Sequence, residues 1–311
     1  MPNNEPIRQH YVPRAYLKNF AEWRSNEYYI HALPVADFKD DAIRSVNIRN
    51  VCLEKNLYTL AGETEEDRLI IERFYGQKFE NHYGEFYGLL TDESKKNASE
   101  SERRLIVSTV ISMLCRTPHD LNNFNKSWDK VIEMIYTNCE ELGTDEFEFQ
   151  GHKMSIAGQT MEETKKNNKV LGKQTNVIKQ LQNALNLIEL RIQRDGLYVS
   201  RLDENYEFIS SDNPVTMESG AISSDLFNPN HILSLPIDTK HRLSLLPIAK
   251  ETTKGMIVRN YSSKTDSHSE ALVANNTQDK GAERFLLGSE NGLRHYYNMV
   301  QPYANANNTT M

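Results

Sequence analysis

The sequence predicts an α+β protein in which a helical middle of about four long helices packs on a largely antiparallel sheet. Short runs rich in aromatic and β-branched residues occur near the start of the chain and again between residues 197 and 260. Between residues 63 and 195, apolar residues instead recur at steps of three and four, which is the helical period. Because the two kinds of segment occupy separate stretches, we expect the N-terminal strands to join the C-terminal sheet.

A chain of 311 residues is long enough for one large domain or two small ones. We expect a single α+β domain over residues 1–300 and a flexible tail over residues 301–311, since the ending YANANNTTM offers little to bury. The alternative is a separable helical subdomain over residues 63–195.

The N-terminal part is expected to hold an extended arm followed by two strands. Pro13 restricts Val12 to extended conformations and cannot lie inside a helix. Strands are predicted over Glu27–Val35 and Lys55–Leu60, which are aromatic and β-branched and are bounded by polar residues or proline.

The helical middle begins at Glu63 with a helix that has an aromatic stripe on one face. The stripe comprises Ile71, Phe74, Tyr75, Phe79, Tyr83, Phe86 and Leu90. Ser99 and Glu102 have the spacing of a capping box and open a second helix, whose segment Leu105–Cys115 is apolar on nearly every side. Pro118 ends that helix, and a third runs to about Leu142, where Gly143 stops it.

After a short strand or loop over Glu146–Lys153, a long polar helix is predicted from Gln159, with Gly196 as its cap. Short strands separated by turn residues follow and predict an antiparallel sheet. They are LYVSRL, EFISSD, ILSLPID, RLSLLPI and MIVRN. Two helices, Asp266–Asn275 and Gln278–Leu287, complete the expected order.

The composition limits the classes of function. There are 36 basic and 43 acidic side chains, and the net charge of −7 argues against extensive coverage of DNA, although a local basic groove stays possible. No run reaches the roughly 18 apolar residues of a membrane helix, and three cysteines cannot form a closed disulfide framework. We expect a cytoplasmic protein with no membrane partner. Its partners are otherwise unknown, with a small-molecule nucleotide or RNA as candidates.

His10 is the first candidate catalytic residue. Imidazole transfers protons near neutral pH, and Pro13 would stiffen the backbone that presents it. Arg14 in the same segment is a candidate substrate-binding cation. The alternative for His10 is a hydrogen bond to a backbone carbonyl, with the neighbouring apolar residues anchoring the arm.

Asp212 and Asn213 follow the predicted strand EFIS and precede Pro214, so a carboxylate and an amide are fixed on one turn. Asp212 could orient an imidazole or ligate a metal, and Asn213 could donate to a developing anion. The alternative is an Asx-turn in which Asp212 accepts backbone N–H bonds.

Two charged residues in the helical middle complete the candidate set. Arg116 ends the most apolar helix, where it complements the helix dipole or binds a phosphate, a carboxylate or Asp212 itself. Glu72 lies one turn after Arg68, so an exposed salt bridge competes with an inward, substrate-binding position.

Familiar site signatures are absent from the sequence. There is no Gly-rich phosphate loop, CxxC, HExxH or GxSxG, and the histidines show no pair at metal-ligand spacing. The three cysteines lie in or beside apolar stretches, so we expect buried thiols rather than nucleophiles. No cofactor is predicted. Binding of a divalent metal ion by His10 and Asp212 is kept as an alternative.

Several segments together resemble domain-of-unknown-function family 4238, an uncharacterised and mostly bacterial family. The resemblance extends from about Gln9 to Leu287 and is carried by HYVPRAYLKNF, YYIHAL, EKNLYTL, CRTP and FISSDNPV. It implies a shared fold and a shared pocket without naming a substrate. The positions that look characteristic of the family and that this chain matches are His10, Pro13, Arg116, Asp212, Asn213 and Pro214. The resemblance implies functional roles for His10 and Asp212.

Two functional hypotheses follow. The first is a hydrolase acting on a phosphodiester or nucleotide, an RNase-like effector in toxin or anti-phage defence, with His10, Asp212 and Arg116 as catalytic residues. Asn213, Arg14 and Glu72 would bind its substrate. The second is a non-catalytic binding module in which the same residues hold the N-terminal arm onto the sheet.

Overall fold

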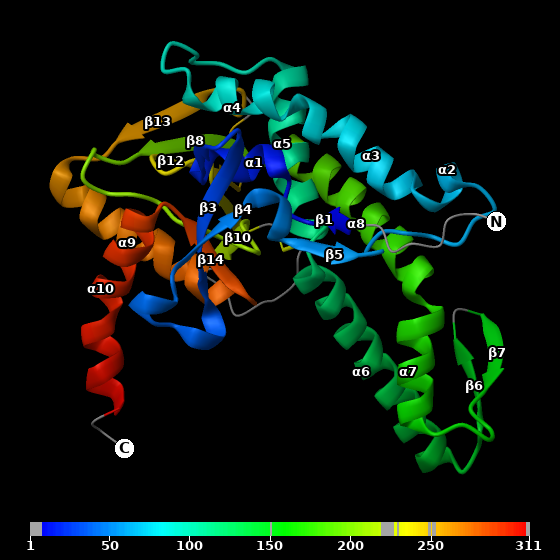
Figure 1. Ribbon diagram of the computed structural model, residues 1–311. Helices are drawn as coiled ribbons and strands as arrows, with labels where there is room; N and C mark the ends of the chain where they lie inside the picture. The colour runs from blue at the N-terminus through cyan, green and yellow to red at the C-terminus, as the bar shows by residue number, and fades with distance from the viewer. Residues whose placement is uncertain are drawn as a thin grey trace.

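A computed structural model describes residues 8–149, 151–218, 227–228, 230–247, 250 and 253–308. Two five-stranded sheets lie beside a helical middle, as Figure 1 shows. The α+β class predicted from the sequence is confirmed. Helices α6 (Pro118–Leu142) and α7 (Met161–Leu171) and the hairpin of β6 (Glu146–Phe149) and β7 (His152–Ser155) extend away from the sheets on one side (Figure 1). Helix α10 (Glu290–Asn308) lies on the other side (Figure 1).

The first sheet contains most of the predicted C-terminal strands. Its order is β10 (Thr216–Glu218), β11 (Ile232–Pro236), β12 (His241–Leu246), β8 (Gly196–Arg201) and β13 (Ile257–Tyr261). Pairing is antiparallel from β10 to β8, but β13 runs parallel to β8. The connection from β12 to β13 passes over β8, so β13 pairs with the other edge of β8 and runs in the same direction as β8.

The second sheet joins the two ends of the chain. Its order is β2 (Glu22–Arg24), β3 (Glu27–Pro34), β14 (Phe285–Gly288) and β9 (Ser210–Ser211), and β4 (Arg44–Asn47) also pairs with β3. The β3–β14 ladder is antiparallel and places Leu33 opposite Leu286. N-terminal and C-terminal strands therefore do pair, but the expected single sheet is wrong, because β8 and β10–β13 form a separate sheet without N-terminal strands.

The N-terminal arm forms β1 (Arg8–His10), which pairs with β5 (Leu53–Lys55) before α1 (Arg14–Leu17). The strand predicted over Lys55–Leu60 is wrong, because β5 ends where that strand was expected to begin. The backbone of Asn56 has φ 55°, so the chain turns there instead of staying extended.

The single helix expected from Glu63 is interrupted. The chain forms α2 (Glu65–Arg68), α3 (Ile70–Lys78), a 3₁₀ turn over Glu80–His82, and α4 (Tyr83–Thr91). The aromatic stripe is buried as predicted, apart from the half-buried Phe74. The break at Phe79, with φ −127° and ψ −53°, turns Glu80 toward the end of α5.

Helices α5 (Glu100–Cys115) and α6 (Pro118–Leu142) confirm the predicted ends. The Ser99 and Glu102 capping box is formed, Thr117 caps α6, and Gly143 adopts the left-handed conformation with φ 63°. Ten of the sixteen residues of α5 are buried, so this helix lies at the centre of the core. After α6, strands β6 (Glu146–Phe149) and β7 (His152–Ser155) form a hairpin where one short strand or a loop was expected.

The long helix expected from Gln159 is two helices, α7 (Met161–Leu171) and α8 (Lys173–Arg194), which meet at Gly172. Gly196 is not its cap but the first residue of β8, and Asp195 occupies the cap position. The expectation of one helix is wrong because a glycine in the helix interior lowers the helical propensity where the two segments meet.

The expectation of two helices over Asp266–Asn275 and Gln278–Leu287 is also wrong. Helix α9 (Lys264–Gly281) covers the first predicted helix and part of the second, and Phe285–Gly288 forms β14. A short apolar run is compatible with a helix or with a strand. Here it is a strand, paired with β3 on one side and β9 on the other, and Leu286 and Leu287 are fully buried. Of the predicted strand EFISSD, only Ser210–Ser211 is extended. Helix α10 (Glu290–Asn308) continues into the expected tail, and residues 309–311 lie outside the described residues.

One main core connects these elements. It includes Tyr11 and Tyr16 of the N-terminal arm, Val110 of α5 and Leu287 of β14, all of which are at most 2% exposed. None of the helices described has the length and apolar character needed to cross a bilayer.

Candidate functional site

Four segments that are distant in sequence meet in one junction: β1–α1, the α5–α6 turn, the corner after β9, and the loop between α9 and β14. The arm is tied to the second sheet by a 2.6 Å hydrogen bond between the Tyr16 and Ser210 hydroxyl groups. At the α5–α6 turn, Thr117 Oγ1 donates to Asn213 Oδ1 over 3.4 Å. The junction therefore brings together the segments whose motifs carry the resemblance.

Arg116 lies at the centre of this junction and is fully buried. Its Nη1 donates to Glu80 Oε1 at 2.8 Å, and its Nη2 donates to the His10 carbonyl at 2.6 Å. The guanidinium carbon lies 4.7 Å from the centre of the Tyr75 ring, a cation–π distance. The carboxylate partner of Arg116 is thus Glu80, and not Asp212, which was one of the alternatives that the sequence left open.

The charge of Arg116 is secured by its neighbours. Burial alone would lower the pKa of Arg116, but Tyr58 and Glu80 outweigh burial and raise it. The Tyr58 hydroxyl also donates to the Arg116 carbonyl, and the Tyr58 backbone N–H donates to Gln9 Oε1 over 2.7 Å. The N-terminal arm and the end of α5 are therefore held by reciprocal polar contacts.

His10 is half-buried at the end of β1, and its Nε2 lies 3.3 Å from the carbonyl of Ile48. If Nε2 donates this hydrogen bond, Nδ1 carries the lone pair and can accept a proton. Burial lowers the pKa of His10, and the positive charge of Arg14 lowers it further. Arg14 itself is exposed at the start of α1, so a cation lies beside the imidazole at the surface.

Glu72 lies on α3, and the charged groups near its carboxyl are Arg116 and Glu80. Burial raises the pKa of its carboxyl, Arg116 opposes that rise, and Glu80 adds to it. Among the described residues, the buried Glu72 Oε2 has no hydrogen-bond partner. In the same set, two more buried nitrogens of the junction lack a partner, Gln9 Nε2 and Arg116 Nε.

Asp212 and Asn213 occupy the closed side of the junction and are 4% and 7% exposed. The two carboxylate oxygens of Asp212 accept the backbone N–H groups of Glu283 and Arg284, each at 3.0 Å. Burial raises the pKa of Asp212, and these hydrogen bonds oppose the rise. Asn213 Nδ2 donates to the Gly281 carbonyl over 3.2 Å.

The structure therefore divides the predicted residues into two groups. Arg116 binds the His10 carbonyl and lies near the Glu72 carboxyl, with Arg14 beside the His10 ring at the surface. Asp212 and Asn213 instead bind the end of α9 and the loop after it. Sequence analysis missed Glu80 and the ring partners Tyr58 and Tyr75. The only sequence signal for Glu80 was the polar Glu80-Asn81 step that interrupts the aromatic stripe.

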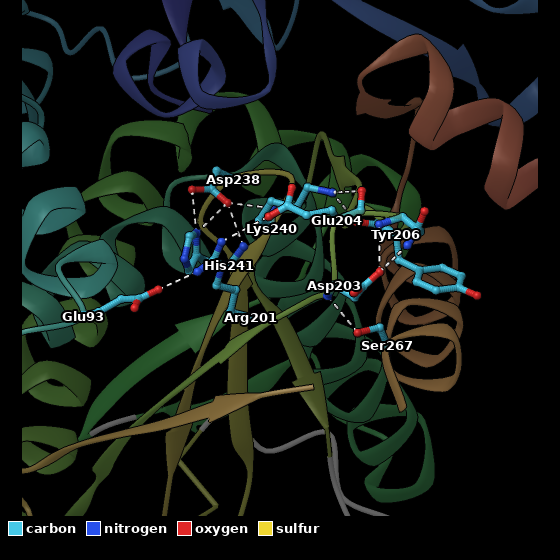
Figure 2. A network of polar contacts seen from close by, with 10 residues as sticks. Glu93, Arg201, Asp203, Glu204, Tyr206, Asp238, Lys240, His241 and Ser267 are labelled. Atoms are coloured by element: carbon cyan, nitrogen blue, oxygen red, sulfur yellow. Dashed lines mark hydrogen bonds and ion pairs between the residues drawn. The ribbon is translucent and has the colours of Figure 1, made fainter. Parts of the chain in front are cut away.

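A second polar constellation lies at the hairpin between β11 and β12, and Figure 2 shows the Asp238 carboxylate facing the His241 ring. His241 Nδ1 is 3.0 Å from Asp238 Oδ2, and the Tyr87 hydroxyl donates to that oxygen over 2.8 Å. Burial would raise the pKa of Asp238, but hydrogen bonds from His241 and from the backbone lower it. The sequence analysis missed this pair, whose signal was a D-x-x-H spelling in a turn.

Within the described residues, no group of three or more His, Cys, Asp or Glu side chains is arranged to hold a metal ion. Cys52, Cys115 and Cys139 are free and buried, which confirms the expectation for the thiols. Burial raises the pKa of Cys52 and of Cys115, so neither is prepared as a thiolate.

These features define an α+β protein whose N-terminal arm, central helix and C-terminal sheet meet at a buried arginine. Residues 8–291 match the family described as Protein of unknown function (DUF4238). The chain belongs to this family. No curated protein and no solved structure matches it.

Proposed function

We propose that this chain is a hydrolase of phosphodiesters or nucleotides, with His10 as general base and Glu72 as general acid. The observation that carries the proposal is that burial lowers the pKa of His10 and raises that of Glu72, while both groups feel the charge of one shared neighbour, Glu80. Both shifts favour the uncharged forms, which are a basic imidazole and a protonated carboxyl. The exposed Arg14 beside His10 supplies a cation for an anionic substrate.

The chemistry balances with these groups alone. His10 Nδ1 takes a proton from a water molecule as the water oxygen forms a bond to phosphorus. The phosphorus–oxygen bond to the leaving group then breaks, and Glu72 gives its proton to that oxygen. Arg116 is a positioning residue in this proposal, because its guanidinium holds the His10 carbonyl and Glu80. Asp212 likewise acts by holding the loop at Glu283.

The test measures hydrolysis of a chromogenic phosphodiester, a nucleoside triphosphate and an RNA oligonucleotide by the purified chain. We expect His10→Ala and Glu72→Gln each to lower kcat by roughly 10²-fold or more, with thermal unfolding nearly unchanged. His152→Ala is the matched control, because His152 is exposed on the β6–β7 hairpin. His119 is a less suitable control than His152, because its side chain is only 39% exposed and its Nδ1 contacts Glu283 Oε1 at 2.9 Å.

A non-catalytic binding module is the second candidate, and a specific observation favours it. Arg116, Asp212 and Asn213 are buried and hydrogen-bonded to protein groups, as residues that hold the arm in place would be. The same experiment separates the two candidates. Absence of hydrolysis for every probe, or activity that falls only in proportion to folded protein, would reject the hydrolase and leave the binding module.

A further inference from the structure

A fully buried guanidinium at the C-terminal end of α8 uses only one of its three nitrogens. Arg191 Nη1 donates to Asp195 Oδ2 at 2.9 Å and to the His231 carbonyl at 2.7 Å. In the described part of the chain, the buried Arg191 Nε and Nη2 have no hydrogen-bond partner. These two atoms form the side edge of the guanidinium, whose parallel N–H bonds bind two oxygens of one oxyanion.

Two further unpartnered nitrogens belong to the residues that surround Arg191. They are Arg194 Nη2 and Nε2 of the fully buried His231, again counting the described residues only. Arg194 Nε donates to Asp195 Oδ1 over 3.3 Å, so the two arginines share one carboxylate. His231 Nδ1 lies 2.7 Å from the Met217 sulfur of β10. The four atoms thus belong to three residues that are connected at the end of α8, since Arg191 binds the His231 carbonyl and shares Asp195 with Arg194.

The charges at this place do not balance. Among the described residues in contact here, Arg191 and Arg194 carry two positive charges against the single negative charge of Asp195. Burial lowers the pKa of Arg191 and raises the pKa of Asp195, so both groups lose hydration here. The C-terminal carbonyls of α8 are already occupied, since Arg103 Nη2 donates to the Ile192 carbonyl at 2.6 Å. A buried excess of positive charge is costly unless an anion compensates it.

We propose that Arg191, Arg194 and His231 bind a phosphate-class oxyanion, which is either inorganic phosphate or the phosphoryl group of a nucleotide. The side edge of Arg191 binds two oxygens, and Arg194 Nη2 donates to a third. The Met217 sulfur can only accept, so His231 Nδ1 donates to it, and the lone pair of His231 Nε2 accepts from the hydroxyl of a hydrogen phosphate or of a singly protonated phosphoryl group. A tetrahedral anion offers more than the two oxygens of a carboxylate and so suits three binding groups. This site is separate from the junction at His10, and the bound anion links α8 to β10 and to the residue before β11.

The test is thermal unfolding of the full chain with increasing inorganic phosphate at constant ionic strength. Sodium chloride and sodium acetate serve as controls, and AMP forms a second arm. We expect the Tm to rise with phosphate or AMP and not with chloride or acetate, following the mass-action law for a ligand of the folded state. A larger shift with AMP identifies a nucleotide as the source of the phosphoryl group, and an equal or smaller shift identifies free phosphate.

Two variants locate the binding. Arg191→Lys keeps a cation for Asp195 and the His231 carbonyl but removes the side edge, and Arg194→Gln removes the second cation. We expect each variant to bind phosphate at least tenfold more weakly by titration calorimetry. Arg104→Gln is the matched control, because Arg104 is an exposed arginine that pairs with Glu189 of the same helix α8. If Arg191→Lys fails to fold, Arg194→Gln alone decides.

Two results would overturn the proposal. One is a wild-type chain whose Tm does not respond to phosphate or AMP, and the other is a response that Arg194→Gln retains in full. The outcome is distinguishable from the proposed hydrolase, because a shift from phosphate bound at His10 would be lost in His10→Ala and kept in Arg194→Gln, whereas the shift proposed here behaves in the opposite way.

Discussion

At the scale of single residues, arginines that bind backbone carbonyls recur in this protein, and Arg103 and Arg116 are among the buried ones. Arg116 binds the His10 carbonyl, and Arg103 binds carbonyls at the end of α8. Arg259 donates to four carbonyls at and just after the end of α4, which are those of Leu89, Leu90, Asp92 and Lys95. The guanidinium has five donors and stays charged when buried, so one side chain satisfies carbonyls that a helix end leaves unpaired.

Asp212→Asn should lower the stability of the protein more than any activity it has. The carboxylate accepts two backbone N–H groups, from Glu283 and Arg284. An amide offers one oxygen, so one buried N–H would lose its partner at a cost of about 1–3 kcal/mol. Thermal unfolding should show a drop of several degrees in Tm. A normal Tm together with lost hydrolysis would instead assign the carboxylate to the chemistry.

Asp120 gives the stability of the protein a defined pH dependence. Burial raises the pKa of this carboxyl to about 6, although it accepts a 2.8 Å hydrogen bond from Gln180. The folded chain then binds the proton more tightly than the unfolded chain. The contribution to stability is complete below about pH 4 and is lost as the pH rises through about 6.

Asp120→Asn cannot ionise and keeps an acceptor for Gln180. Relative to the wild type, its free energy of unfolding should therefore rise by up to about 3 kcal/mol between about pH 4 and about pH 7.5. Denaturant titrations at both pH values measure this difference. Asp92→Asn is the opposite control, because hydrogen bonds from Ser94 lower the pKa of Asp92. A difference between Asp120→Asn and wild type that does not vary with pH would contradict the expectation.

At the scale of elements, α5 is the helix on which the others pack. Val110 lies in its middle and is 0% exposed. Val110→Asp should abolish soluble expression, because an unpaired buried carboxylate costs several kcal/mol against a total stability of about 5–15 kcal/mol. The readout is the soluble yield and the melting curve. Val273→Asp is the control, because Val273 is 59% exposed on α9, and an unchanged melting curve for Val110→Asp would show that α5 is not central.

At the scale of the whole molecule, one main core includes the arm, α5 and the C-terminal strands, as Tyr11, Val110 and Leu287 illustrate. We therefore expect unfolding in a single transition, with a calorimetric to van't Hoff enthalpy ratio of about 1. Differential scanning calorimetry makes the measurement. Two resolved transitions would instead favour a separable helical subdomain over residues 63–195.

The sequence by itself determined the features that depend on local chemistry. The Ser99 capping box, the Gly143 stop, the proline at the start of α6 and the strand Glu27–Pro34 each follow from a few neighbouring residues. The α+β class also followed, because segments with different hydrophobic periods occupied separate stretches of the chain. Of the candidate site, the sequence supplied His10, Arg116 and Glu72 as individual groups.

Only the tertiary structure decided which of these groups meet. Phe285–Gly288 is a strand because β3 and β9 pair with it on both sides, and no local signal distinguishes that run from a helix. Arg116 pairs with Glu80 rather than with Asp212 because the helix break at Phe79 turns Glu80 inward. Partners such as these are separated by tens to hundreds of residues. Their choice depends on which long-range packing buries the most apolar surface while leaving each buried charge a partner.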